Sequence, residues 1–115
     1  MKYLVMLTKV NKNRIIKNIK TGKEDNYDVL KFQPIEKNEN GEYESSNLLP
    51  MDKWFKQDDE NYNQIKSMCS FGTWFYVGIN WYGKIGIVEP YIQNNSEQDF
   101  INKYSNNSAI SESNN

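Results

Sequence analysis

The chain contains no histidine, and this absence removes several classes of active site. Without histidine there is no Ser-His-Asp or Cys-His nucleophile system, no His-based acid–base catalysis and few of the usual zinc sites. The single cysteine, Cys69, excludes an internal disulfide framework and fits a reducing cytoplasm. No phosphate-binding glycine motif is present, because Gly78, Gly83 and Gly86 fall within a predicted hairpin. We therefore expect no enzymatic activity, no cofactor and no metal site.

Long hydrophobic segments and a strong net charge are also lacking. The apolar run Tyr3–Leu7 is shorter than a signal-peptide core, and nothing approaches the ~20 residues of a membrane-spanning helix. We expect no membrane association and a cytoplasmic location. The net charge is -1, yet residues 1–35 carry eight basic and three acidic side chains, and residues 36–60 carry three and eight. Either a solvated surface without a partner or a basic sheet face beside an acidic connector would explain this division.

Size and composition fit one small domain. The chain has 115 residues, of which 37% are hydrophobic and 14% aromatic, which is enough for a compact core. After about residue 95 the sequence becomes polar and rich in Ser and Asn. We therefore predict a domain over residues 1–95 and a polar, flexible tail over residues 96–115, with a short helix within 97–104 as an alternative for its first part.

The hydrophobic pattern predicts five strands, at residues 2–10, 14–19, 27–35, 73–82 and 84–93. A helix of about three turns is expected to start at Asp58-Asp59-Glu60, where acids suit a helix N-terminus better than a cation site. Trp54 and Phe55, ahead of that helix, are expected in the core. Three strands, a helix and two strands is the chain order of a five-stranded OB barrel, with one connector helix between strands 3 and 4. An open α+β sheet is the main competing architecture.

The segment FGTWFYVGINWYGKIGIVEPYIQ, residues 71–93, predicts a hairpin whose first strand is aromatic on both faces. Alternation assigns one set of side chains to the core: Phe75, Val77, Ile79 and Trp81. It assigns Trp74, Tyr76 and Tyr82 to the opposite face. A one-residue bulge at Gly78 would exchange the two faces for everything after it.

The second face combines rings with cations from neighbouring strands. The candidate nucleic-acid-binding residues are Trp74, Tyr76, Tyr82 and Tyr27 for stacking, and Lys12, Arg14, Lys17, Lys20, Lys23 and Lys31 for phosphates. Flat rings that stack bases and cations that follow the backbone are what single-stranded nucleic acid requires. Burial against a second layer, a homodimer interface and a surface that binds another protein are the alternatives for the same rings.

This chain resembles small OB-fold single-stranded DNA-binding proteins of phages and plasmids. The resemblance spans residues 2–93 and rests on strand order, the connector helix, the closing hairpin and a polar tail. It implies a sequence-tolerant, non-enzymatic binder of single-stranded DNA that forms a homodimer, with RNA left open as a ligand. The chain departs from the pattern in its slightly negative net charge and in a tail end, residues 105–115, whose only charge is Glu112. The alternative is a phage- or plasmid-encoded interaction module that inhibits or adapts a host or replication protein through the same face.

Overall fold

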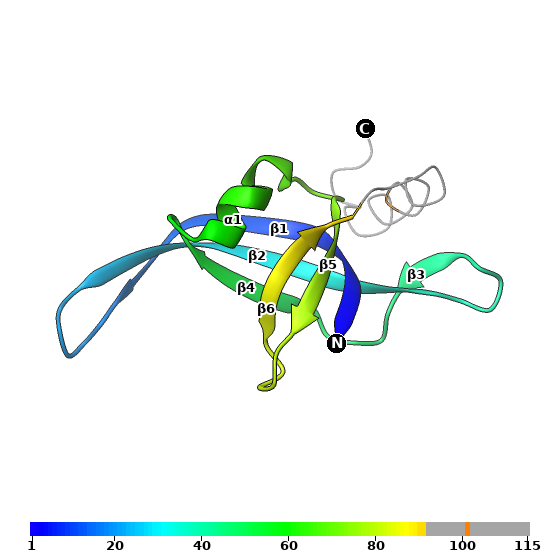
Figure 1. The fold of residues 1–115 in the computed structure, drawn as a ribbon, viewed down its shortest axis with the longest axis horizontal. Helices are drawn as coiled ribbons and strands as arrows, with labels where there is room; N and C mark the ends of the chain where they lie inside the picture. Colours follow the sequence, from blue (N-terminus) through cyan, green and yellow to red (C-terminus); the bar gives the residue numbers. More distant parts are fainter. Residues whose placement is uncertain (92–100, 102–115) are drawn as a thin grey trace, which may run out of the picture.

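The computed structural model describes residues 1–91 and residue 101, and an antiparallel β-sheet dominates it (Figure 1). The strands are β1 (Lys2–Lys17), β2 (Glu24–Lys37), β3 (Tyr43–Ser45), β4 (Met51–Lys56), β5 (Trp74–Ile79) and β6 (Ile85–Pro90). One short helix, α1 (Glu60–Ile65), continues into a 3-10 turn, η1 (Lys66–Met68). The prediction of a mainly β protein is therefore confirmed.

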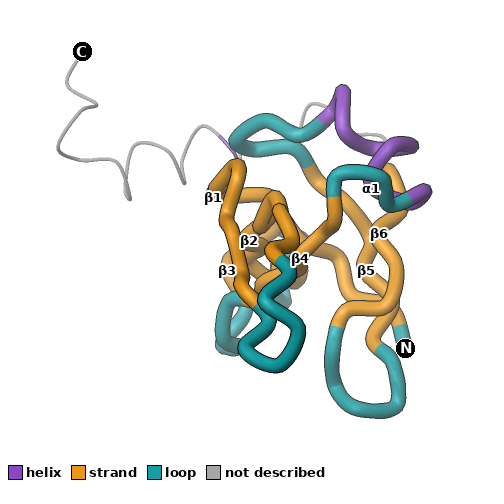
Figure 2. The backbone as a smooth tube through the Cα atoms, turned by 90° about the vertical axis from the view of Figure 1, so that its left-hand side faces the viewer, coloured by secondary structure: helices purple, strands orange, loops and turns teal. Residues whose placement is uncertain are grey.

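The sheet has the order β3-β2-β1-β5-β6. The strand β4 pairs with residues 27–32 of β2, on the same edge on which β3 pairs with residues 35–37. All pairings are antiparallel. The strands curl around a common centre, and α1 lies at one end against β6 (Figure 2). Within the described residues β4 and β6 form no ladder, so the sheet is not closed into a barrel. The expectation of a closed five-stranded barrel is therefore wrong.

Side chains occupy the place of the missing ladder. The Lys53 ammonium donates to the Ile85 carbonyl at 3.2 Å, which links β4 to β6 at one point. On α1, the Asn61 amide accepts from the Val88 N–H and donates to the Val88 carbonyl, both at 2.9 Å. These bonds satisfy part of the free edge of β6 without a neighbouring strand.

Strand boundaries differ from the prediction in a systematic way. The expected strands 2–10 and 14–19 are one strand, β1, with a register shift between Asn11 and Arg14. Asn13 takes a φ of 59° in this bulge, a conformation that asparagine tolerates, and its N–H donates to the Asp28 carboxylate at 3.0 Å. The predicted break is therefore a bulge within a continuous ladder. The strands β3 and β4 were not predicted, and α1 is shorter than the expected helix.

The main core fills the concave side of the sheet and is closed at one end by α1. It consists of Val5, Leu7, Leu30, Phe32, Phe55, Tyr62, Ile65, Phe75, Val77, Ile85 and Val88. Asp59 caps α1 by accepting from the Tyr62 N–H at 3.1 Å, and this cap directs the Tyr62 ring onto Phe55. Phe75 and Val77 lie in this core as predicted, and Ile79 packs against it.

A second cluster lies on the opposite side of the sheet, which we call the outer face. Met6, Ile35, Trp74 and Ile101 form its buried centre. Ile101, which falls within the predicted tail, is helical and buried here. The rest of the predicted tail, and the alternative of a short helix within 97–104, otherwise lie outside the described residues.

Candidate nucleic-acid interface

Two of the predicted stacking rings lie on the expected face of the sheet but are covered. Trp74 is fully buried in the second cluster, with the Tyr43 ring 4.9 Å away and the Tyr91 ring 5.9 Å away, centroid to centroid. Tyr76 is half-buried and meets Tyr91 edge-on at 5.0 Å. Trp74 is therefore not available to stack a base, and its prediction as a ligand-facing ring is wrong.

The other rings of the hairpin lie at its tip. Trp81 is 95% exposed and Tyr82 is 82% exposed, so the assignment of Trp81 to the core is wrong and Tyr82 is open to a ligand. The Asn80 side chain builds the tight turn by accepting from the N–H groups of Tyr82 and Lys84. Because both rings belong to this turn, strand alternation does not govern them. The ladder also shifts register after Gly78, the residue at which a bulge was anticipated.

A different ring, Trp54, lies on an exposed part of the outer face, at the edge formed by β4. The pairing register arranges nine side chains there in three rows: Lys56, Tyr27, Arg14; Trp54, Val29, Asn11; Asp52, Lys31, Lys9. Residues paired across neighbouring strands share a face, so these side chains form one surface over β4, β2 and β1. We call this surface the nine-residue patch.

Contacts within the patch hold its rings in place. The Tyr27 and Trp54 rings meet edge-on, with centroids 5.7 Å apart and planes at 73°. The Arg14 guanidinium lies 5.6 Å from the Trp54 centroid, within cation–π range. Trp54 keeps 39% of its surface exposed while Val29 beneath it is buried. A ring, a second ring and a guanidinium plane are thus presented together to solvent.

The patch is electropositive. It carries four cations (Arg14, Lys9, Lys31 and Lys56) against one acid, Asp52. The Lys31–Asp52 pair is long, at 3.9 Å, and nearly half-exposed on both sides, so it neutralises little. Lys9 and Lys31 are direct register partners, and like charges in that position are unfavourable. An anion bound between them would relieve this repulsion.

A groove of about 510 Å³ begins at Trp54 and leads toward the hairpin tip. It is lined by Pro50, Met51, Asp52, Lys53 and Trp54 on one side and by Gly83, Lys84 and Ile85 on the other. The groove occupies the gap where β4 and β6 do not pair. It therefore leads from Trp54 of the nine-residue patch to Gly83, which directly follows Trp81 and Tyr82 in the turn.

The structure brings together only part of the predicted basic set. Arg14, Tyr27 and Lys31 meet in the patch. Lys17 is three residues beyond Arg14 and faces the other side of the ribbon, while Lys20 and Lys23 belong to the loop that follows. Lys12 lies in the bulge near Asp28 and Cys69, on the core side.

Sequence reasoning missed Trp54 as a surface ring. The signal was present in MDKWFK, residues 51–56, where strict alternation places Trp54 opposite the buried Phe55. Treating Trp54 and Phe55 together as core anchors hid this alternation. Of the two, Phe55 alone is buried.

The buried titratable groups belong to the core and not to the patch. The Asp28 carboxylate accepts from the Asn13 N–H, the Gln57 amide at 2.7 Å and the Tyr62 hydroxyl at 2.5 Å. Burial raises the pKa of Asp28, but these hydrogen bonds and the charge of Lys12 lower it overall below its ordinary value of 3.8. Burial, and then the bond to Asp28, raise the pKa of Tyr62. Burial also raises the pKa of the Cys69 thiol to about 11.

Over residues 1–91 and 101, no three His, Cys, Asp or Glu side chains gather closely enough to hold a metal ion. In the same part of the chain no helix has the length and apolar character needed to cross a membrane.

Comparison with known proteins gave no match of any kind: no family model, no curated protein and no solved structure is similar to this chain.

Proposed function

We propose that this protein binds single-stranded DNA, without strong sequence preference, on the nine-residue patch. The observation that carries the proposal is the pair of rings, Trp54 and Tyr27, set among four cations with one opposing acid. Aromatic rings stack any base through its π-face, and cations follow the phosphates whatever the sequence. This combination serves a flexible, charged, aromatic polymer better than it serves a small molecule.

The position of the patch supports the proposal. Setting the three-residue β3 aside, the long strands run β1, β2, β4, then α1, then β5 and β6. OB domains bind oligonucleotides on the face of their second and third strands, between the first and last hairpin loops. The patch lies on β2 and β4, and the corresponding loops are residues 18–23 and 80–84.

On binding, the patch residues would take distinct roles. A base would stack on the exposed face of Trp54, and Arg14 would leave its place over that ring to meet a phosphate. Lys9 and Lys31, held opposite each other, would share a second phosphate, and Lys56 would meet a third. The strand would then continue along the groove toward Lys84, where Tyr82 and Trp81 offer two further stacking surfaces.

Fluorescence titration with oligo-dT tests this proposal. In a Trp81→Phe background, whose remaining indoles are Trp54 and the buried Trp74, we expect strong quenching that salt reverses. In that background Trp54→Ala should remove the quenching and weaken binding by about tenfold to a hundredfold, as expected for one stacked base. Lys9→Ala with Lys31→Ala should weaken binding and reduce its salt dependence by about one released counterion, because the two lysines share one phosphate.

The matched control is Lys66→Ala, because Lys66 is exposed on η1 and contacts the Tyr62 ring on the core side. It should leave affinity and salt dependence unchanged. Absence of binding at low salt, or equal effects of the Lys66 and Lys9–Lys31 variants, would refute the proposal.

A second candidate function is binding of another protein through the hairpin tip. Next to the exposed Trp81 and Tyr82 lies an apolar groove of about 270 Å³, lined by Tyr3, Leu48, Leu49, Met51, Ile79 and Gly83. Exposed Trp and Tyr beside an apolar groove are typical of protein-binding hot spots. Trp81→Ala should then abolish capture of that protein and leave quenching of Trp54 by oligo-dT intact.

A further inference from the structure

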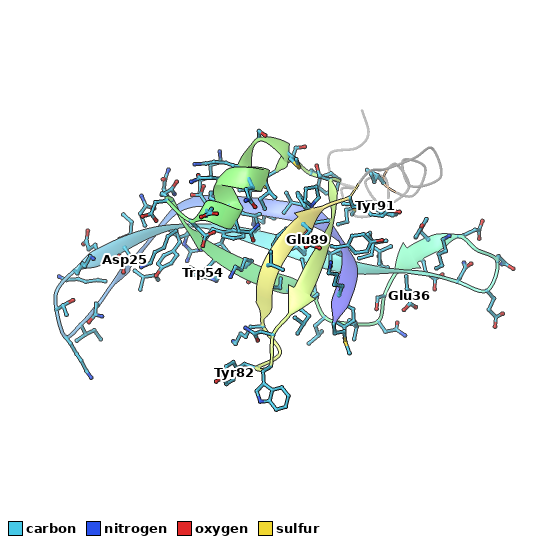
Figure 3. The ribbon with its side chains drawn as sticks, viewed as in Figure 1. Asp25, Glu36, Trp54, Tyr82, Glu89 and Tyr91 are labelled. Carbon is cyan, nitrogen blue, oxygen red and sulfur yellow. The ribbon has the colours of Figure 1, made fainter. Side chains whose placement is uncertain are left out.

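The two ends of the molecule carry opposite charge. At one end, β1 and β2 project as a ribbon that we call the basic arm, residues 15–24. At the other, β2 and β3 form the acidic hairpin, residues 36–45. Figure 1 shows them at the left and right extremes of the long axis, and in Figure 3 Asp25 and Glu36 stand beside the two ends. Residues 15–24 have three lysines and one acid, with a second acid, Asp25, next to them as the register partner of Ile16; the hairpin has four glutamates and one lysine.

The basic arm exposes apolar surface as well as charge. Ile15, Ile16 and Ile19 are 60%, 46% and 96% exposed, an unusual density of solvated isoleucine for ten residues. The arm lies beyond the region where β4 pairs with β2 and β5 pairs with β1, so it is a two-stranded ribbon. Its cations, Lys17, Lys20 and Lys23, take part in no ion pair among the described residues, although Lys17 is the register partner of Glu24. The proposed DNA-binding patch does not use them.

The acidic hairpin holds two carboxylates in an unfavourable arrangement. Glu36 on β2 and Glu44 on β3 are direct register partners, and like charges directly opposite destabilise a strand pair. Over the described residues neither forms an ion pair, and the contact of Glu44 with the neutral Asn38 amide at 3.3 Å does not neutralise it. A cation supplied from outside the chain would relieve the repulsion.

We propose that the basic arm of one copy docks on the acidic hairpin of a second copy. The partner is a second copy because every chain carries both complementary surfaces, the basic arm and the acidic hairpin. The two lie at opposite ends of the molecule, so the arm cannot reach the hairpin of its own chain. Lysines of the arm would lie against the Glu36–Glu44 pair, and burial of the exposed isoleucines would add apolar stabilisation. Two copies lying antiparallel would make this contact twice.

Sedimentation velocity on the full chain without DNA tests the contact. The wild-type protein should self-associate at about 0.02 M salt, and the dissociation constant should rise about tenfold or more at about 0.5 M salt because the charges become screened. Lys17→Glu with Lys20→Glu should reduce association by at least about tenfold, as should Glu36→Lys with Glu44→Lys. An equal mixture of the two variants should restore association. The acidic arm of the first variant then meets the basic hairpin of the second, and the basic arm of the second meets the acidic hairpin of the first.

The control is Glu60→Lys with Asp58→Lys, which changes exposed acids outside the hairpin and should leave association unchanged. Circular dichroism of each variant establishes that it folds. A wild-type protein that stays monomeric at low salt, or a mixture that fails to restore association, overturns the inference. Titration of the same variants to saturation with oligo-dT separates the outcomes, because Trp54 belongs to neither end and its final quenching should persist even where charge reversal lowers the affinity.

Discussion

Tyr62→Phe removes one hydroxyl from the core and leaves its shape unchanged, and we expect a large loss of stability from it. Asp28 is 2% exposed, and its charge is balanced by three donors: the Asn13 N–H, the Gln57 amide and the Tyr62 hydroxyl. A hydrogen bond to a charged group is worth about 1.5–3 kcal/mol, and removing the donor leaves a buried carboxylate oxygen without its partner. We therefore expect the free energy of unfolding at neutral pH to fall by about 2 kcal/mol, or about 8–16 °C in Tm for a domain of this size.

The effect should depend on pH with a defined sign. The pKa of Asp28 in the folded protein lies below its ordinary value of 3.8, so its ionised form contributes stability that is fully present above that pH. This contribution is lost as the pH falls through the folded pKa. Losing the Tyr62 donor raises the folded pKa of Asp28, so the difference between wild type and Tyr62→Phe should narrow below pH 3.8.

Urea denaturation at a series of pH values measures both quantities. Tyr43→Phe is the control, because Tyr43 is partly exposed and packs by its ring against Trp74. It should change stability by less than about 0.5 kcal/mol. A Tyr62→Phe protein as stable as the control at neutral pH, or a difference that stays constant in acid, would show that the Asp28 network does not stabilise the fold as argued.

Three other experiments, at Cys69, Gly72 and Asn61, test the packing. Cys69 is partly buried, its pKa is raised to about 11 by that burial, and its Sγ donates to the Ile65 carbonyl at 3.4 Å. It should react slowly with a disulfide reagent at pH 8 and faster once urea unfolds the protein; equal rates in the native and unfolded protein would contradict this protection. Gly72→Ala should lower the free energy of unfolding by about 2 kcal/mol or more, because its φ is +91° and a Cβ would lie 2.8 Å from Ile101 Cγ2. Gly41→Ala is the comparison: its φ is +78° but a Cβ would meet open space, so the loss should be about 1 kcal/mol. Adding Ile101→Ala should recover part of the first cost in a double-mutant cycle, and additive costs would place Ile101 elsewhere. Asn61→Asp should lower stability by about 1–3 kcal/mol, because a carboxylate cannot donate to the Val88 carbonyl, and hydrogen exchange along β6 should accelerate; an unchanged exchange rate would refute that role.

The alternation of side chains along a strand correctly predicted which residues are buried where one face of the strand packs on the main core. Phe75 and Val77 followed it because β5 is paired on both sides and one face is packed. It failed for Trp81, since the hydrogen bonds of Asn80 turn the chain before that residue. Period-two patterns carry no information about where a strand ends and a turn begins.

Which rings of the outer face are covered could not be predicted from the local sequence. Trp74 lies on the predicted side of the sheet, yet Tyr43, Tyr91 and Ile101 cover it from distant parts of the sequence. Trp54 lies on the same side of the sheet and stays partly exposed, because Tyr43 of β3 and Ile101 pack over the part of the outer face around Trp74 and not over the part around Trp54. Both indoles satisfy the same sequence pattern, so the long-range cover alone decides which of them can meet a ligand.

The open seam between β4 and β6 has a consequence for how the protein behaves in a crowded solution. Free strand edges can template addition of another chain and so promote aggregation, and a closed barrel avoids this by having no edges. Here the two edges face each other across a groove that contains Lys53 and Lys84, and Asn61 occupies the main-chain groups of Val88. Each edge is thus shielded by the other and by side chains that cannot extend a ladder. A foreign strand would therefore find few unbonded main-chain groups of β6 along this gap.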